Sequence, residues 1–301
     1  MRTRSLRSLA AAGVFGLLAQ SCTPAVPQEP GANDRQREIQ ALLDAPNPLK
    51  PSASVWIEDL TYMEVRDRIR DGHITAIIPT GGVEQNGPYL TTGKHNVILQ
   101  SLCPAIAVEL GNALCAPIVP FVPEGNIDPP SGAMHFPGSI SVRDETFHAL
   151  LDDIASSLKQ NGFREIVLLG DSGGNQRGMA AVAKELNERW AGSGTRAHFL
   201  GEFYTPGWEV TMQYSDDELG VKETKNDGHH DDIWVTAMMV VTDPGSVRYD
   251  ERVAADLASI NGIDLEPLEK TVELGEKMVT YRARYTADVI RAAIADEASG
   301  S

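Results

Sequence analysis

The sequence predicts an α/β fold in which helices cover both faces of a mainly parallel sheet. Apolar runs typical of buried strands alternate with segments of helical period between residues 75 and 203. This alternation favours parallel strands, because parallel neighbours need a helical crossover between them. The polar clusters of the chain also follow the predicted strands, and the carboxyl ends of such strands are where ligands bind.

Four strands are predicted, at residues 75–79, 114–122, 165–169 and 196–203. Helices are expected between them, at 96–110, 147–158 and 179–190, and from Asp232 to the end of the chain. Apolar residues of the second helix recur at the spacing of one helical face. Residues 123–137 contain Pro129 and Pro130 and are expected to form a long irregular loop at the rim of the site.

The first 21 residues have the features of a signal peptide. Arg2, Arg4 and Arg7 form a basic start, and the apolar run at 9–19 is too short to span a bilayer. Cys22 follows the expected cleavage point and suits lipid attachment. We therefore expect an exported, periplasmic protein whose only membrane contact would be a lipid on Cys22.

The proline-containing stretch at 22–34 is predicted to be a tether, and 35–301 a single domain. The formal net charge of −16, with no basic stripe to offset it, excludes nucleic acid as a partner. Cys103 and Cys115 are the remaining cysteines. In an oxidising compartment they could form a disulfide or stay as two buried thiols, and the sequence leaves both open.

The first polar cluster follows the first predicted strand. Glu84 and His95 lie eleven residues apart in a turn-rich segment that also holds Asn86 and Lys94. A carboxylate oxygen with an imidazole nitrogen suits Zn, Mn or Fe, so the pair could hold a metal ion. Alternatively, the segment is a glycine-rich connection whose polar groups cap the next helix. Lys94 could balance the acids or bind a substrate carboxylate.

The second cluster, at 170–175, follows the third predicted strand and allows three interpretations. Asp171 could be a metal ligand or an orienting group. Ser172 could be a nucleophile, since Gly170-x-Ser172-x-Gly174 matches the nucleophile-elbow pattern in its strand–turn–helix context. The run could also be a tight turn with Asp171 capping the helix. A triad would also need a base: only His198, His229 and His230 lie downstream of Ser172, and Asp227 is too close to the last two for the usual geometry.

The third cluster, at 226–232, holds His229, His230 and Asp232 among further acids. Crowding these groups together is unfavourable unless they share a cation or a proton, which favours a functional role. The alternative is that the acids simply lie at the positive end of the following helix. His135, in the rim loop, could touch substrate or be a surface residue. Trp208 and Trp234 are expected to be packing residues.

Five segments of the chain together resemble the creatininase family. They read PTGGVEQNGP at 79–88, FPGSIS at 136–141, NGFREIV at 161–167, GDSGGN at 170–175, and His230 with TAMM at 236–239. They occur in family order across roughly residues 55 to 245. The resemblance implies a three-layer α/β/α sandwich, homo-oligomers, and a two-metal centre that hydrolyses a C–N bond of a small cyclic or linear amide.

The chain departs from the family pattern at several ligand positions. Glu84 matches a family ligand, but Asn86, His95 and Ser172 stand where the family has a histidine, an aspartate and a histidine. The late family glutamate falls near Val235 or Thr236. We therefore expect one divalent ion per chain, Zn, Mn or Fe. Its expected ligands are Glu84, His95, Asp171 and Asp232, with His230 as the alternative to Asp232.

On this hypothesis the protein is a metal-dependent hydrolase of an amide or lactone bond in a small molecule. A metal-activated water attacks the carbonyl, and His230 or His229 shuttles the proton. Asn86 and Ser172 orient the substrate or stabilise the oxyanion. Two alternatives remain open: a serine hydrolase that uses Ser172, and a non-catalytic ligand-binding lipoprotein on a decayed creatininase scaffold.

Overall fold

The computed structural model describes residues 31–299. The predicted signal peptide and Cys22 lie outside the described residues. The described residues fall into two units, with a boundary between Ala45 and Pro46. The helix α1 (Ala32–Asp44) belongs to the first unit, so the predicted boundary between residues 34 and 35 falls inside a helix. All further structural statements concern the second unit.

Four parallel strands form the sheet and confirm the predicted fold class. They are β1 (Thr75–Thr80), β2 (Ala113–Cys115), β3 (Glu165–Gly170) and β4 (Arg196–Phe199), in the order β2-β1-β3-β4. The pairing of β1 with β3 extends to Thr80 and Gly170, so these two strands end side by side.

Two of the predicted strands are shorter than expected. The run at 114–122 leaves the sheet after Cys115 and meets β1 again only at the Thr80–Val119 bridge. Pro117 and Pro120 lack the amide hydrogen that a strand needs for continuous pairing. The predicted strand at 196–203 ends at Phe199 and is followed by a 3₁₀ turn at Gly201–Phe203.

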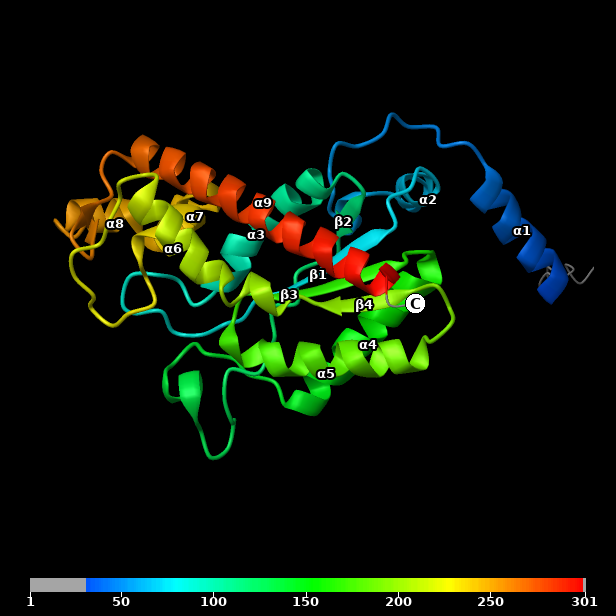
Figure 1. Ribbon diagram of the computed structural model, residues 1–301, viewed down its shortest axis with the longest axis horizontal. Coiled ribbons are helices and arrows are strands. Elements are labelled where there is room, and N and C mark those ends of the chain that lie inside the picture. The colour runs from blue at the N-terminus through cyan, green and yellow to red at the C-terminus, as the bar shows by residue number, and fades with distance from the viewer. Residues whose placement is uncertain (1–30, 300–301) are drawn as a thin grey trace, which may run out of the picture. The chain divides into compact units, whose positions relative to one another are not determined.

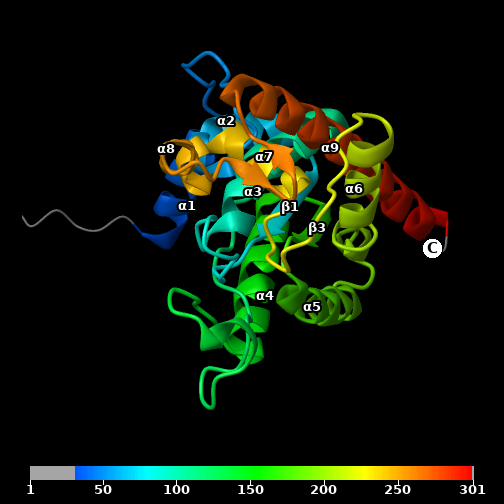
Figure 2. The same cartoon turned by 90° about the vertical axis from the view of Figure 1, so that its left-hand side faces the viewer.

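Helices cover both faces of the sheet (Figures 1 and 2). One face carries α3 (Lys94–Leu110), α7 (Ile233–Thr242) and the long α9 (Leu268–Ser299), which pack on one another. The other face carries α4 (Asp144–Asn161) and α5 (Gln176–Arg189). The remaining helices are α2 (Tyr62–Arg70), α6 (Gly207–Asp217) and α8 (Tyr249–Ala254), and β5 (Ser259–Ile260) pairs with β6 (Ile263–Asp264) in a small hairpin.

The strands feed two hydrophobic cores because their side chains alternate between the faces. Ile77 and Val167 belong to the core beneath α3, α7 and α9. Ile78 and Leu168, one residue further along each strand, belong to the core against α4 and α5. Both faces are therefore buried, which explains why β1 and β3 are apolar without alternation in the sequence.

A disulfide joins α3 to the end of β2. Cys103 and Cys115 are bonded, with their Cα atoms 6.3 Å apart, which resolves the alternative that the sequence left open. The bond ties a helix of one layer directly to the sheet. None of the helices in the described part of the chain is both long and apolar enough to cross a membrane.

The strand order places a topological switch point between β1 and β3. The connection from β1 to β2 runs through α3 on one face, whereas α4 and α5 connect β2, β3 and β4 on the other. The loops after β1 and β3 therefore diverge and leave a crevice at their carboxyl ends. The polar clusters around Glu84 and Asp171 follow these two strands.

Candidate active site

A cavity of about 550 Å³ lies at this edge of the sheet. All four predicted metal ligands line it: Glu84, His95, Asp171 and Asp232. Of the predicted catalytic residues, Ser172 and His230 line the cavity, whereas Asn86 and His229 do not. Six of the eight predicted site residues therefore lie together at one cavity. The lining also includes Lys94 and Glu124, and Glu124 was not predicted.

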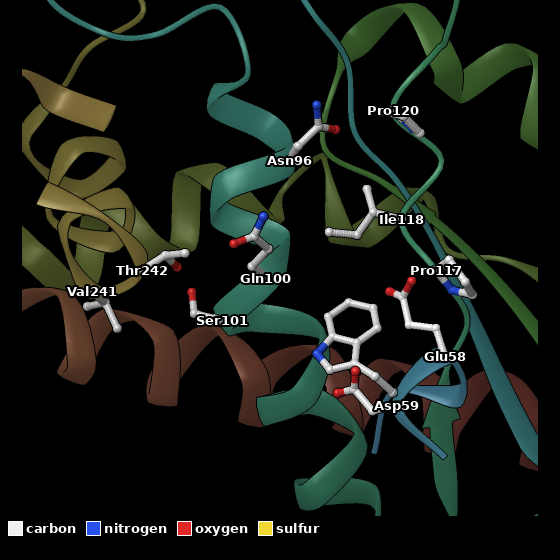
Figure 3. Close-up of a pocket in the computed structure, with 11 residues that line it drawn as sticks. Glu58, Asp59, Asn96, Gln100, Ser101, Pro117, Ile118, Pro120, Val241 and Thr242 are labelled. Atoms are coloured by element: carbon white, nitrogen blue, oxygen red, sulfur yellow. The ribbon is translucent and has the colours of Figure 1, made fainter. Parts of the chain in front are cut away.

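A second cavity, of about 720 Å³, lies beside α3 and near the end of α7 (Figure 3). Figure 3 shows Gln100 and Ser101 on the helix side and Glu58, Asp59 and Ile118 opposite. None of its lining residues is a histidine, a lysine or a cysteine, and both of its carboxylates are exposed. The chemically reactive side chains therefore gather in the first cavity.

His95 is the centre of the polar cluster in the first cavity. Its Nε2 lies 2.8 Å from Glu84 Oε1, and its Nδ1 lies 2.8 Å from Asp171 Oδ2. A carboxylate only accepts hydrogen bonds, so both ring nitrogens donate and His95 is an imidazolium. Burial and the charge of Lys94 lower the pKa of His95, but its hydrogen bonds to Asp171 and Glu84 raise it above the ordinary value.

Asp171 continues this chain of charges into the core. Its Oδ1 accepts a 3.4 Å hydrogen bond from Nη2 of the fully buried Arg282, which also donates to the carbonyl of Phe203 at 2.9 Å. The Arg282 guanidinium lies 3.3 Å from the ring centroid of Trp208. Burial lowers the pKa of Arg282 to about 10, so the group is still cationic at neutral pH. Asp171 is thus held between two cations.

Lys94 adds a third cation to this part of the site. It is the first residue of α3 and is only 5% exposed, and its Nζ donates to the backbone carbonyl of His230 at 3.4 Å. Burial lowers its pKa, and the charges of Glu84, Asp171, Asp232 and Glu124 oppose that shift. A cation at the amino end of a helix is disfavoured by the helix dipole, so these carboxylates are what stabilise it there.

Glu124 faces the cavity from the rim loop. Its Oε2 accepts a 3.1 Å hydrogen bond from the hydroxyl of Ser172, and its buried Oε1 has no hydrogen-bond partner among residues 31–299. Burial, followed by the negative charge of Glu84, raises the pKa of Glu124 to about 7. A carboxyl group with a pKa near neutrality can both take up and release a proton, as a general base must.

The rim loop is held by contacts that the sequence did not predict in detail. Ser141 accepts the backbone N–H of Glu124 at 2.9 Å and donates to Gly125 O at 2.7 Å. The first turn of α4 receives no side-chain cap. On the other side, Gly174 approaches the loop so closely that a Cβ would overlap the carbonyl oxygen of Pro123. Glu124 is therefore fixed from both sides.

The third cluster contributes one face of the cavity. His230 is solvent-exposed at the cavity edge, and partial burial and the charge of Lys94 lower its pKa. His229 is exposed and packs against Gly87. Trp208 and Trp234, expected to be packing residues, line the cavity with ring centroids 4.6 Å apart.

Neither Asn86 nor His135 lines the cavity. Asn86 is buried outside the cavity and donates to the carbonyl of Glu84 at 2.9 Å, so it shapes the loop after β1 and does not face a substrate. His135 is exposed and is not among the residues that line the cavity.

The predicted metal ligands do not fit a metal ion as they lie in this structure. Within residues 31–299 no group of three or more His, Cys, Asp or Glu side chains is placed to hold one. A metal-bound histidine is neutral and offers a lone pair, but both nitrogens of His95 donate to carboxylates. Asp171 is shared between His95 and Arg282. The prediction of one divalent ion in this set is therefore not supported by the geometry.

The sheet order and the polar crevice define an α/β protein with a candidate ligand site at the switch point of a parallel sheet. Residues 58–290 match the family of creatinine amidohydrolases. The chain therefore belongs to the creatininase family, as its sequence motifs suggested. This membership defines it as a relative of small-molecule hydrolases.

Three known proteins illustrate the similarity. A creatinine amidohydrolase of Pseudomonas putida is 25% identical over 231 residues, 72% of this chain and 83% of that protein. A zinc–zinc form of a creatininase variant superposes with a TM-score of 0.57 at 23% identity, over 80% of this chain and 98% of the other. A manganese form of creatininase gives 0.56 at 21%, over 79% and 98%. The two solved creatininase structures share the fold of this chain, and they are the zinc and manganese forms of a metalloenzyme.

Proposed function

We propose that this protein hydrolyses the C–N bond of a small polar amide, cyclic or linear, with Glu124 as the general base. Membership of the creatininase family supports hydrolysis of a small molecule as the class of reaction. The observation that carries the specific proposal is Glu124 itself. It is buried, faces the cavity, has one unpartnered oxygen and has a pKa near 7.

The proposed reaction needs no group beyond those that line the cavity. The Glu124 carboxylate takes a proton from a water molecule while the water oxygen bonds to the amide carbon. The carbonyl oxygen becomes an oxyanion, which the Lys94 ammonium stabilises with its remaining N–H donors. As the C–N bond breaks, Glu124 passes the proton to the leaving nitrogen. Water and amide thus become a carboxylic acid and an amine.

His230 and the two tryptophans have supporting roles in this proposal. His230 has a lowered pKa and is mostly neutral near pH 7, so it accepts or donates a hydrogen bond to the substrate. This replaces the proton shuttle predicted for His230 and His229. Trp208 and Trp234 present ring surface against which a flat amide or small ring can pack.

A second candidate mechanism uses Ser172 as the nucleophile. Its hydroxyl already donates to Glu124 at 3.1 Å, which is the contact a serine needs for activation by a base. Gly173 and Gly174, which follow it, also line the cavity just before α5. In this version Glu124 accepts the serine proton as the serine oxygen bonds to the amide carbon, and it passes that proton to the leaving nitrogen as the C–N bond breaks. Glu124 then takes a proton from a water molecule that attacks the acyl-serine, and the proton returns to the Ser172 oxygen as the acid is released. The two versions share the same base and differ in the attacking oxygen.

The test is a hydrolysis screen with matched glutamate variants. Wild-type protein is offered creatinine, other five- and six-membered cyclic amides, linear formamides and small lactones. We expect turnover of at least one amide, and a loss of about 10² to 10⁴ in kcat/KM for Glu124→Gln. Glu165→Gln is the control, because Glu165 pairs with His198 outside the cavity.

The outcomes separate the alternatives. Full activity of Glu124→Gln would refute the proposal. Turnover of lactones without amides would keep the base and change the substrate class. Saturable binding of panel compounds without any turnover would instead support the non-catalytic ligand-binding protein.

We further propose that the enzyme works outside the cytoplasm. The Cys103–Cys115 disulfide supports this proposal, because such bonds persist in oxidising compartments. It agrees with the signal-peptide features of the first 21 residues. A tagged full-length chain should be recovered from the periplasmic fraction, and recovery from the cytoplasm alone would refute export.

A further inference from the structure

We propose that this site uses protein-borne cations in place of divalent metal ions: the imidazolium of His95, the ammonium of Lys94 and the guanidinium of Arg282. The inference deepens the proposed hydrolase function and rests on it for its catalytic meaning. The loss of metal binding, however, is a separate property that can be measured without any turnover.

The first step concerns His95. Each of its ring nitrogens lies 2.8 Å from a carboxylate oxygen, one on Glu84 and one on Asp171. Both nitrogens carry a proton in this arrangement, so neither has a lone pair for a metal ion. The carboxylates of Glu84 and Asp171, which are natural oxygen ligands, have the imidazolium as their counter-ion. His95 thus holds together two groups that would otherwise need an external cation.

The second step concerns the charge balance of the cavity. Four carboxylates line it, from Glu84, Glu124, Asp171 and Asp232. His95, Lys94 and Arg282 supply three positive charges, so at most one carboxylate charge is left without a counter-charge. A divalent ion placed among these groups would therefore leave an excess of positive charge in the site. Such an excess is strongly unfavourable where the surroundings are of low polarity.

The third step is that the cations are built into the fold. Lys94 and His95 are the first two residues of α3, and both are about 95% buried. Arg282 lies in the middle of α9, fully buried, with its guanidinium stacked on Trp208 and bonded to Phe203 and Asp171. Neither the lysine nor the arginine can move to solvent without loss of core packing. The fold therefore keeps both basic groups beside the carboxylates of the cavity.

The residues at the expected ligand positions of the family also argue against a metal site. Asn86, His95 and Ser172 occupy positions where the family resemblance places metal ligands. Here Asn86 does not line the cavity, both ring nitrogens of His95 donate to carboxylates, and the Ser172 hydroxyl donates to Glu124. His95 goes further, since it replaces an expected carboxylate by a cation. The solved relatives include zinc and manganese forms. The chain has thus exchanged ligands for counter-ions at the same place in the fold.

The test measures metal content and metal-dependent stability of the full mature chain, purified without chelator. We expect far less than one Zn, Mn or Fe per chain by elemental analysis. We also expect the Tm to be unchanged by EDTA or by added ZnCl₂ or MnCl₂. One tightly held ion per chain, or a Tm that rises on the order of 5 °C with metal, would overturn the inference.

A gain-of-function variant adds an experiment in which metal binding should appear. His95→Asp removes the imidazolium and adds a carboxylate beside Glu84 and Asp171, so these groups should now require an external cation. We expect its Tm to fall in EDTA, to recover with Mn or Zn, and its metal affinity to exceed that of wild type by at least tenfold. His135→Asp, on the exposed rim, controls for the change of charge alone.

A failure of the proposed hydrolase function can be distinguished from a failure of this inference. If wild type binds no metal but hydrolyses nothing in the amide panel, the proposed function fails and this inference stands. If wild type binds metal and hydrolyses amides only when loaded, this inference fails and the hydrolase function stands. Should His95→Asp not fold, the measurements on wild-type protein decide the matter alone.

Discussion

The hydroxyl of Ser172 donates a 3.1 Å hydrogen bond to the carboxylate of Glu124, although the two residues are 48 positions apart in the sequence. The bond joins the turn after β3 to the rim loop, which follows β2. It brings a nucleophilic oxygen and a base with a pKa of about 7 into one cavity.

Replacing Glu124 should stabilise the protein at alkaline pH while it abolishes activity. The folded protein holds a proton on Glu124 up to a pKa of about 7, whereas the ordinary value is 4.5. The folded state therefore binds more protons between these values, and stability is lost as the pH rises through this window. The difference between these two pKa values corresponds to about 3 kcal/mol of folding free energy.

Glu124→Gln removes this dependence. Near pH 8 we expect the free energy of unfolding of the variant to exceed that of wild type by about 3 kcal/mol. Near pH 4 the two free energies should be nearly equal. Urea unfolding at the two pH values measures this difference. An equal effect of the substitution at both pH values would show that Glu124 has an ordinary pKa.

The role of Ser172 can be read from Ser172→Ala. If water attacks the substrate, the variant keeps most of its activity and wild type is not labelled by a fluorophosphonate probe. The hydrogen bond from Ser172 lowers the pKa of Glu124, so its loss raises that pKa. The kcat/KM of wild type should fall about tenfold per pH unit below pH 7. In Ser172→Ala this fall should begin at a higher pH.

A loss of activity by about 10⁴-fold in Ser172→Ala, together with covalent labelling of wild type, would instead identify the serine as the nucleophile. Ser193→Ala, in the turn before β4, provides a matched serine control outside the cavity.

Much of this site could be predicted from the sequence. Glu84, His95, Asp171 and Asp232 converge on one cavity because each lies in or just after a loop at the carboxyl edge of the sheet. This follows from the strand–helix alternation and the rule that parallel strands end together. The order of the strands and the pairing of Cys103 with Cys115 could not be deduced in the same way, since both depend on contacts between layers.

The interpretation of the site could not be predicted from residue types alone. A histidine flanked by two acids suits a metal site or an ion-pair cluster equally well, and only the positions of both ring nitrogens distinguish them. Arg282 lies 111 residues from its partner Asp171, so no local pattern indicates the pair. Glu124 was overlooked as an ordinary loop acid. Its place after an apolar run at the sheet edge was the available signal.

Close packing between Gly174 and the rim loop should make this position intolerant of any side chain. A Cβ at Gly174 would overlap the carbonyl oxygen of Pro123, the residue before Glu124. We expect Gly174→Ala to cost about 1 to 3 kcal/mol of stability and to lower activity by displacing the base. Gly93→Ala is the control, because its Cβ would have ordinary van der Waals contacts.

Chemical denaturation and kcat/KM of the two alanine variants measure this difference. Equal stability and activity of Gly174→Ala and Gly93→Ala would contradict the close contact between the two loops.

The disulfide should make a measurable contribution to stability. The bond between Cys103 and Cys115 closes a short loop, with a sequence separation of 12 residues. We expect the double variant Cys103→Ser/Cys115→Ser to be less stable by about 3 kcal/mol. Dithiothreitol should destabilise wild type by a similar amount and leave the double variant unaffected. Insensitivity of wild type to reductant under denaturing conditions would indicate that the bond is not formed.

The most direct measurement is amide hydrolysis by protein treated with chelator and dialysed, comparing wild type with Glu124→Gln. We predict that wild type keeps its full kcat/KM in EDTA, and that Glu124→Gln loses about 10² to 10⁴ of it whether or not Zn or Mn is added. Loss of wild-type activity in EDTA, restored by either metal, would contradict a site that depends on Glu124 and on the cations His95, Lys94 and Arg282.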